Sequence, residues 1–252
     1  MNNVYIYDGS FENLLILISE LLKFKNNPDN IKNKYKFSPS LLDNVINLNL
    51  TNKIDNLNEF ISKFSLDIIH TIYYVFLSEN DNKELVIYYF LKNALKYKNS
   101  IYLHRNLRCV NMAIDISNYV GREAHKLKGF LRFKLLNNNI YYAEVNPTNN
   151  VISILSNHFK KRLKGEFWII KDVNRSIYAF YNKKNVYCLT DKEVISLNLE
   201  LSEENEKYED LWKNFFETIG IKERKNLKVQ RNFMPKKYWN YILEMENKIW
   251  KK

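Results

Sequence analysis

The apolar residues of this chain change their spacing at Gly129. From Ile54 to Lys128 they recur mostly at steps of three and four residues, which is the pattern of amphipathic helices. From Leu131 to Leu135 they alternate with polar residues, which is the pattern of a half-buried strand. The chain is therefore predicted to be helical in its first half and to form a sheet after Gly129.

Turn and capping residues divide these patterns into elements. We expect strands at 4–7, 131–135, 140–145, 167–173, 177–181 and 186–189, and helices at 11–24, 41–46, 54–77, 83–97, 102–128, 149–163, 211–219 and from Pro235 onward. The remainder of 25–53 and the basic stretch 222–231 read as connectors.

This order of elements predicts an α+β protein. It has a mainly helical N-terminal half with a short first strand, a central and mostly antiparallel sheet of about five strands with a crossing helix, and C-terminal helices. The regions 1–128, 129–200 and 201–252 are expected to form one compact unit.

The chemistry of two turns makes the expectations around Gly129 more specific. Gly129 is predicted to end the long helix, because glycine suits the left-handed conformation past a helix C-terminus. A three-residue loop at 137–139 would place Lys134 opposite Tyr142 and Arg132 opposite Glu144. An Arg132–Glu144 ion pair is therefore expected on the polar face of this hairpin.

The positive charge is concentrated in two segments. The chain carries a net charge of +11, yet 121–175 and 211–252 each hold eleven Lys and Arg against four Asp and Glu, so the rest of the chain is net negative. A Lys-rich and Asn-rich composition can come from an AT-rich genome alone. The uneven distribution favours an anionic partner such as nucleic acid.

Several classes of site and location are not indicated. The N-terminus lacks the pattern of a signal peptide, and no apolar run is long enough to span a membrane. Cys109 and Cys188 match no metal or redox spacing, so both are expected to be reduced thiols in a cytoplasmic protein. No metal site and no cofactor is predicted.

Three stretches resemble one bacterial family. They are VYIYDGSF at the start, REAHKLKGFLRF with IYYAEVNP and HFKKRL…WIIKDV in the centre, and LWKNFFETIGIKERKN…QRNFMPKKYW at the end. The chain is similar to the "probable DNA metabolism protein" family, a domain of unknown function. Relatives are encoded beside a radical-SAM protein assigned to DNA modification or repair, and some are fused to a uracil-DNA-glycosylase-like domain. The resemblance implies a role in DNA repair or modification with that radical-SAM partner, but no reaction.

A first hypothesis is a DNA-binding accessory protein. Cationic side chains would neutralise phosphates, and Tyr142, Trp168 or Trp239 could stack on an exposed base. The candidate phosphate contacts are Arg122, Lys126, Lys128, Arg132, Lys134, Arg175, Lys222, Arg224, Lys225, Arg231, Lys236 and Lys237.

Two alternatives stay open. The chain could be an enzyme acting on nucleic acid, with His125, Glu144 and Asp172 (and, less readily, His158) as acid–base or metal-binding groups. It could instead be an interaction module that docks the radical-SAM partner through the FMPKKYW motif. The aromatic cluster of Trp212 and its neighbours on the preceding helix is interpreted as internal packing.

Overall fold

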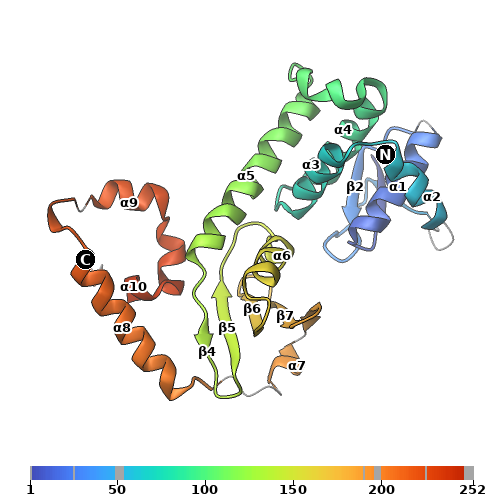
Figure 1. Cartoon of the computed structure of the whole chain (residues 1–252). Helices are drawn as coiled ribbons and strands as arrows, with labels where there is room; N and C mark the ends of the chain where they lie inside the picture. The colour runs from blue at the N-terminus through green and yellow to red at the C-terminus, as the bar shows by residue number, and fades with distance from the viewer. Residues whose placement is uncertain are drawn as a thin grey trace. The chain divides into compact units, whose positions relative to one another are not determined.

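Helix α5 (Arg108–Phe130) contains the boundary between the two units of the chain. The computed structural model describes residues 2–24, 26–48, 54–189, 191–195, 200–224 and 226–246. The first unit comprises Met1–Gly121 and the second Arg122–Lys252. Each unit has its own sheet and its own hydrophobic cluster (Figure 1).

The first unit contains a three-stranded parallel sheet in the order β2-β1-β3. Its elements are β1 (Asn2–Tyr7), α1 (Phe11–Lys23), β2 (Asn30–Asn33) and β3 (Asp43–Asn47). The predicted strand and helix at the start of the chain are confirmed. Helix α1 begins where its sequence indicates, because the Ser10 hydroxyl accepts a hydrogen bond from the backbone N–H of Asn13 at 3.2 Å.

The two outer strands of this sheet differ from what the sequence predicted. The short helix predicted at 41–46 is wrong, since β3 occupies this segment and Val45 lies opposite Val4. Strand β2 was not predicted at all. Both strands pair with β1 across the intervening chain, a contact that local periodicity does not reveal. Lys25 and residues 49–53 of the predicted connector lie outside the described residues.

Four helical segments complete the first unit before α5. They are α2 (Ile54–Ser62), α3 (Leu66–Leu77), α4 (Lys83–Tyr97) and the 3-10 helix η1 (Lys98–Leu103). The prediction of α4 is confirmed. The single helix predicted at 54–77 is wrong, because α2 ends at Ser62. A new helix, α3, then begins after Ser65, which is its N-cap and has an extended conformation.

The ends of α5 also differ from the prediction. The helix begins at Arg108 rather than at residue 102, because η1 occupies the preceding residues. It continues through Gly129 to Phe130, and Gly129 does not adopt a positive φ. The predicted glycine cap is therefore absent, and Gly129 is an ordinary helical residue.

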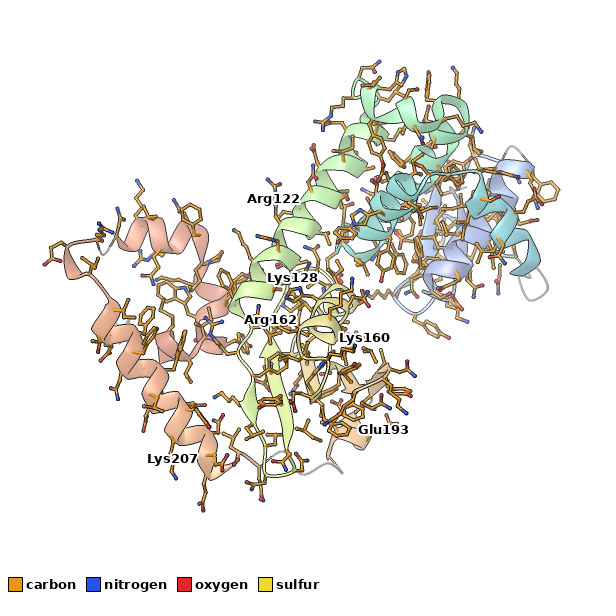
Figure 2. The ribbon with its side chains drawn as sticks, viewed as in Figure 1. Arg122, Lys128, Lys160, Arg162, Glu193 and Lys207 are labelled. Atoms are coloured by element: carbon orange, nitrogen blue, oxygen red, sulfur yellow. The ribbon has the colours of Figure 1, made fainter. Side chains whose placement is uncertain are left out.

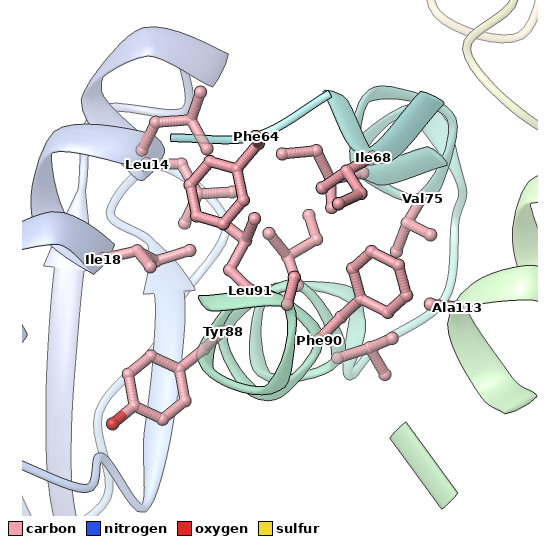
Figure 3. Packing of buried hydrophobic residues seen from close by; sticks show 14 of the residues in the cluster. Leu14, Ile18, Phe64, Ile68, Val75, Tyr88, Phe90, Leu91 and Ala113 are labelled. Carbon is pink, nitrogen blue, oxygen red and sulfur yellow. The ribbon is translucent and has the colours of Figure 1, made fainter. Parts of the chain in front are cut away.

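The core of the first unit lies between α1, α3 and α4 (Figure 3). Leu14 and Ile18 of α1 are fully buried, as are Phe90 and Leu91 of α4. Val75 of α3 is equally buried. Each such side chain contributes about 1.5–3 kcal/mol when it leaves water, so this cluster supplies much of the stability of the unit.

The second unit contains a five-stranded sheet in the order β4-β5-β6-β7-β8. Its elements are β4 (Lys134–Leu135), β5 (Ile140–Val145), α6 (Ile152–Arg162), β6 (Phe167–Asp172), β7 (Ile177–Asn182) and β8 (Val186–Leu189). Strands β5 and β6 are parallel and joined by α6, whereas the other pairs are antiparallel. The predicted α+β class, with its mostly antiparallel sheet and crossing helix, is confirmed.

The β4–β5 hairpin has the predicted register but is shorter than predicted. Lys134 lies opposite Tyr142, and the backbone N–H of Leu136 donates to the carbonyl of Ile140 at 3.0 Å. The strand starts only at Lys134, so the expected strand position of Arg132 is wrong. Arg132 turns back onto the end of α5, where it donates to the Gly129 carbonyl at 2.8 Å.

Short helices follow the sheet. They are α7 (Asp191–Ile195), α8 (Glu203–Ile219), the 3-10 helix η2 (Lys222–Arg224), α9 (Leu227–Phe233), the 3-10 helix η3 (Lys236–Tyr241) and α10 (Leu243–Glu246). The predicted connector at 222–231 is wrong in part, because Asn226 caps α9 by accepting from two backbone N–H groups. The helix predicted from Pro235 is η3 followed by α10. None of the described helices has the length and apolar character required to cross a membrane.

Candidate nucleic-acid interface

The three residues predicted as catalytic do not share a site. Glu144 lies opposite Lys171 in the β5–β6 ladder, and its carboxylate is 3.6 Å from the Lys171 ammonium. Asp172 is the next residue of β6 and therefore points to the other face of the sheet. His125 is exposed on α5, and among the described residues it makes no hydrogen bond to either carboxylate.

Asp172 and Arg175 instead form the turn between β6 and β7. The Asp172 carboxylate is fully buried, and it accepts from the backbone N–H groups of Asn174 and Arg175 and from the Arg175 guanidinium at 2.9 Å. The same guanidinium donates to the carbonyl of Thr148. Burial raises the pKa of Asp172 despite the opposing effect of Arg175. Arg175, predicted to contact phosphate, is thus engaged inside the protein.

A second buried carboxylate, Glu123, organises the end of α5. Its oxygens accept from the backbone N–H groups of Thr148 and Asn149 at 2.9 Å each, and from the Tyr238 hydroxyl at 2.7 Å. The Lys237 ammonium lies 2.9 Å from the same carboxylate. Burial alone would raise the pKa of Glu123, but these hydrogen bonds outweigh it and lower the pKa to about 2. Lys237 is therefore a structural partner of Glu123.

The tryptophans proposed to stack on bases are covered by protein. Trp168 is fully buried in the sheet, with its ring stacked on Tyr181 at 5.2 Å. Trp239 is 6% exposed and donates from Nε1 to the Met234 carbonyl at 2.9 Å. The same burial removes Trp239 as an exposed anchor for a partner protein.

Another group of cations has no carboxylate partner in the described part of the chain, and it combines three predicted phosphate contacts on α5 with α6 residues that were not predicted. Within the described residues, no ion pair or hydrogen bond involves the side chains of Arg122, Lys126 and Lys128 on α5, nor those of the α6 C-terminus. The α6 group consists of Lys160, Lys161, Arg162 and the following Lys164. Figure 2 labels members of both groups on α5 and α6. We call these seven residues the α5–α6 cation cluster.

His158 shows that the two parts of the cation cluster share one electrostatic environment. Burial, followed by the charges of Lys128 and Arg162, lowers the pKa of this histidine. Its Nε2 atom is buried without a hydrogen-bond partner. The ends of α5 and α6 therefore both place positive charge near this imidazole.

The other predicted cations of the C-terminal helices are exposed where the structure describes their side chains. Arg224, Arg231 and Lys236 are exposed on η2, α9 and η3. Nothing is described for the side chain of Lys222, and Lys225 lies outside the described residues.

The remaining predicted residues, Arg132, Lys134, Tyr142 and Glu144, line a cavity of about 420 Å³ in the second unit. It is bounded by the β4–β5 hairpin, α8, and the segment of η3 and α10. The further lining residues include Phe133, Asn205, Tyr208, Glu209, Trp212, Asn240 and Tyr241.

Within this cavity the polar groups form two pairs. The Tyr142 hydroxyl donates to Glu144 Oε1 at 2.6 Å, and burial together with this carboxylate raises the pKa of Tyr142, so the phenol stays protonated. The Lys134 ammonium is 3.5 Å from the Glu209 carboxylate.

Sequence analysis missed the contribution of α8 to this cavity. The interpretation of Trp212 and its neighbours as internal packing is wrong for the exposed members, because Trp212 is 39% and Phe215 54% exposed. Tyr208, Leu211, Trp212, Phe215 and Ile219 recur at helical spacing, and all are exposed. The missed signal was an apolar stripe on a helix whose other face is strongly charged.

The cysteines and acidic groups do not form a metal site in the part of the chain that is described. No group of three or more His, Cys, Asp or Glu side chains there could hold a metal ion. Cys109 and Cys188 are both free thiols, and burial raises the pKa of Cys109.

Comparison with known proteins yields one match. No curated protein and no solved structure is similar to this chain. The model of the family described as a domain of unknown function, DUF4130, matches residues 81–244. These residues are more than half of the chain and run from α4 into α10, so the protein belongs to the DUF4130 family.

Proposed function

We propose that the second unit binds nucleic acid through the α5–α6 cation cluster. The observation that carries this proposal is the set of seven Lys and Arg side chains with no ion pair among the described residues, gathered at two helix ends that act together on His158. Phosphates are the natural partners for such a cluster, because each neutralised phosphate releases condensed counterions.

Helix-end electrostatics alone does not explain the cluster. A cation in the last turn of a helix is stabilised by the helix dipole by about 0.3–1 kcal/mol. This effect fades beyond the last turn, whereas Arg122 lies about two turns before the end of α5. Placing Lys128 and Arg162 near His158 also adds repulsion that stability does not require.

The contrast with the internally paired cations supports the same conclusion. Arg175 and Lys237 have buried carboxylate partners, and Lys134 pairs with Glu209. The chain therefore contains cations that hold its fold and, separately, cations that have no such partner among the described residues. A DNA substrate and a radical-SAM partner, which the resemblance to DNA metabolism proteins implies, would make the protein an accessory factor in DNA repair or modification.

Salt dependence of binding tests the proposal. Affinity of the full chain for short single-stranded and duplex DNA is measured between 50 and 200 mM salt, for the wild type and for Arg122→Glu/Lys126→Glu/Lys128→Glu. We expect a steep negative slope of log affinity against log salt in the wild type. The variant should lose at least about tenfold in affinity, and its slope should be shallower by about 2.

A control with the same charge change separates a local surface from overall charge. Lys96→Glu/Arg105→Glu/Arg108→Glu reverses three exposed cations of the first unit. This variant should bind DNA within about threefold of the wild type at physiological salt, because exposed charges that do not contact the DNA are screened. Equal losses in both variants, or a flat slope in the wild type, would reject the proposed interface.

A further inference from the structure

The cavity beside the β4–β5 hairpin has the walls of a site for a flat ligand. Five aromatic side chains line it, contributed by the hairpin, by α8 and by η3. They are Phe133, Tyr142, Tyr208, Trp212 and Tyr241. A volume of about 420 Å³ falls within the range of small-molecule sites, which starts at about 300 Å³.

Specific contacts hold the walls in place. The Leu135 N–H donates to the Asn205 side chain, and the Ser202 N–H donates to the Leu135 carbonyl, both at 3.0 Å. Leu136 and Leu201 form an antiparallel bridge at the start of the same connection. These bonds extend the hairpin edge into the segment that begins α8. The position of the α8 aromatic residues is therefore tied to the backbone of the sheet.

The charges lining the cavity balance. The lining holds two cations, Arg132 and Lys134, and two carboxylates, Glu144 and Glu209. Both carboxylates also pair with a lysine outside the lining, Glu144 with Lys171 at 3.6 Å and Glu209 with Lys213 at 3.8 Å. Glu144 uses Oε1 for both Tyr142 and Lys171, and its Oε2 accepts no hydrogen bond from a described residue. Asn240 adds an exposed amide. A neutral planar ring with N–H and C=O groups at its edge matches these surroundings.

Arg132 connects this cavity to the α5–α6 cation cluster. Its guanidinium donates to the Gly129 carbonyl at the end of α5, and the guanidinium carbon lies 5.8 Å from the centre of the Trp212 ring. The last cation of the α5 group, Lys128, precedes Gly129 directly. The end of α5 is therefore in direct contact with a residue that lines the cavity.

We propose that this cavity binds one unstacked nucleobase of a single nucleic-acid strand, with Trp212 as the stacking platform and Glu144 as the acceptor for an exocyclic amino or ring N–H group. Phe215 stacks against the Trp212 ring at 5.7 Å, so the base takes the place over this ring where the Arg132 guanidinium now lies. The inference rests on the proposed function for the contact with phosphates. Stacking on an aromatic side chain is worth about 1–3 kcal/mol per base and needs no particular sequence. Glu144 adds a preference for bases that present N–H groups.

The test compares the affinity of a single-stranded 12-mer with that of the same strand carrying one abasic residue at each position in turn. We expect the wild type to lose affinity when the base is removed at one position. Trp212→Ala should weaken binding of the intact strand by about 5- to 150-fold and abolish the penalty for the abasic strand. The slope of log affinity against log salt should not change, because no phosphate contact is lost.

Two further variants keep the test decisive. Phe233→Ala removes an aromatic ring that is 71% exposed on α9 and does not line the cavity, and it should bind both strands like the wild type. Tyr208→Ala removes a lining ring that is 66% exposed, so it tests the cavity even if Trp212→Ala fails to fold. Wild-type behaviour of both Trp212→Ala and Tyr208→Ala would overturn the inference.

Free nucleosides separate this inference from the proposed function. Binding of adenosine, cytidine and thymidine is followed by ligand-observed NMR and by tryptophan fluorescence. Nucleoside binding that Trp212→Ala abolishes supports the base site even if no strand is bound, in which case only the proposed phosphate interface fails. If strands bind with a steep salt slope but show neither an abasic penalty nor nucleoside binding, the phosphate interface stands and the base site is rejected.

Discussion

The Tyr238 hydroxyl donates a 2.7 Å hydrogen bond to the carboxylate of Glu123, a residue 115 positions earlier in the chain. Lys237 binds the same oxygen, and the backbone of Thr148 and Asn149 binds the carboxylate from the loop after β5. One buried side chain thus joins the segments REAHKLKGFLRF and QRNFMPKKYW and the loop after β5, all within the residues that the DUF4130 family model matches. Part of what these segments encode is this structural network.

Removal of the Glu123 carboxylate should destabilise the protein strongly. Glu123→Ala leaves the Tyr238 hydroxyl and the backbone N–H groups of Thr148 and Asn149 without their acceptor, and each donor left unsatisfied in the interior costs about 1–3 kcal/mol. The free energy of unfolding from urea titration measures the loss. Glu166→Ala removes an exposed carboxylate and should change it by less than about 0.5 kcal/mol. A loss below about 1 kcal/mol for Glu123→Ala would contradict the assigned role.

The same network predicts a dependence of stability on pH. The pKa of Glu123 is lowered from 4.5 to about 2, so the folded protein binds a proton at this site less readily than the unfolded chain. The stabilisation, about 3 kcal/mol, is fully present above pH 4.5 and is lost as the pH falls towards 2. Unfolding free energies at pH 6, 4 and 3 should fall more steeply for the wild type than for Glu123→Gln. Parallel curves would show that Glu123 is not the responsible group.

Arg175 should matter for folding and not for binding nucleic acid. Arg175→Met removes the partner of the fully buried Asp172 and should destabilise the protein by about 3–5 kcal/mol, whereas the double change Asp172→Asn/Arg175→Met should cost clearly less. Urea titration of both variants completes the cycle. Where the single variant is still folded, the salt slope for DNA should equal that of the wild type. A shallower slope would mean that Arg175 contacts phosphate after all.

His158 should report on anion binding at the α5–α6 cation cluster. Burial, together with Lys128 and Arg162, lowers its pKa in the free protein, and a bound phosphate would offset the two positive charges. The pKa should therefore rise in the complex, and binding should tighten as the pH falls through the range between the two values. An NMR titration of the four histidines, assigned with His158→Gln, measures the shift. An unchanged pKa in a saturated DNA complex would place the phosphates elsewhere.

Local sequence patterns were sufficient to predict much of the secondary structure of the second unit. The β6–β7 hairpin follows from two short apolar runs around the turn at 174–176, and the sequence predicted both strands to within one residue. The register of Lys134 opposite Tyr142 follows in the same way from a three-residue loop. These features depend on neighbours in the sequence, so side-chain alternation and turn length determine them.

Long-range contacts determine the structural features that the sequence did not predict. The sequence alone determined most helices, the five-stranded sheet and the concentration of positive charge. It could not determine which cations pair with a carboxylate, because Lys237 and Arg175 are distinguished from Lys126 by the buried carboxylates that folding brings to them. Nor could it show that the Trp212 ring stays partly exposed beside the hairpin edge. Pairing of distant carboxylates, strands and helices depends on tertiary packing, which spacing along one chain does not encode.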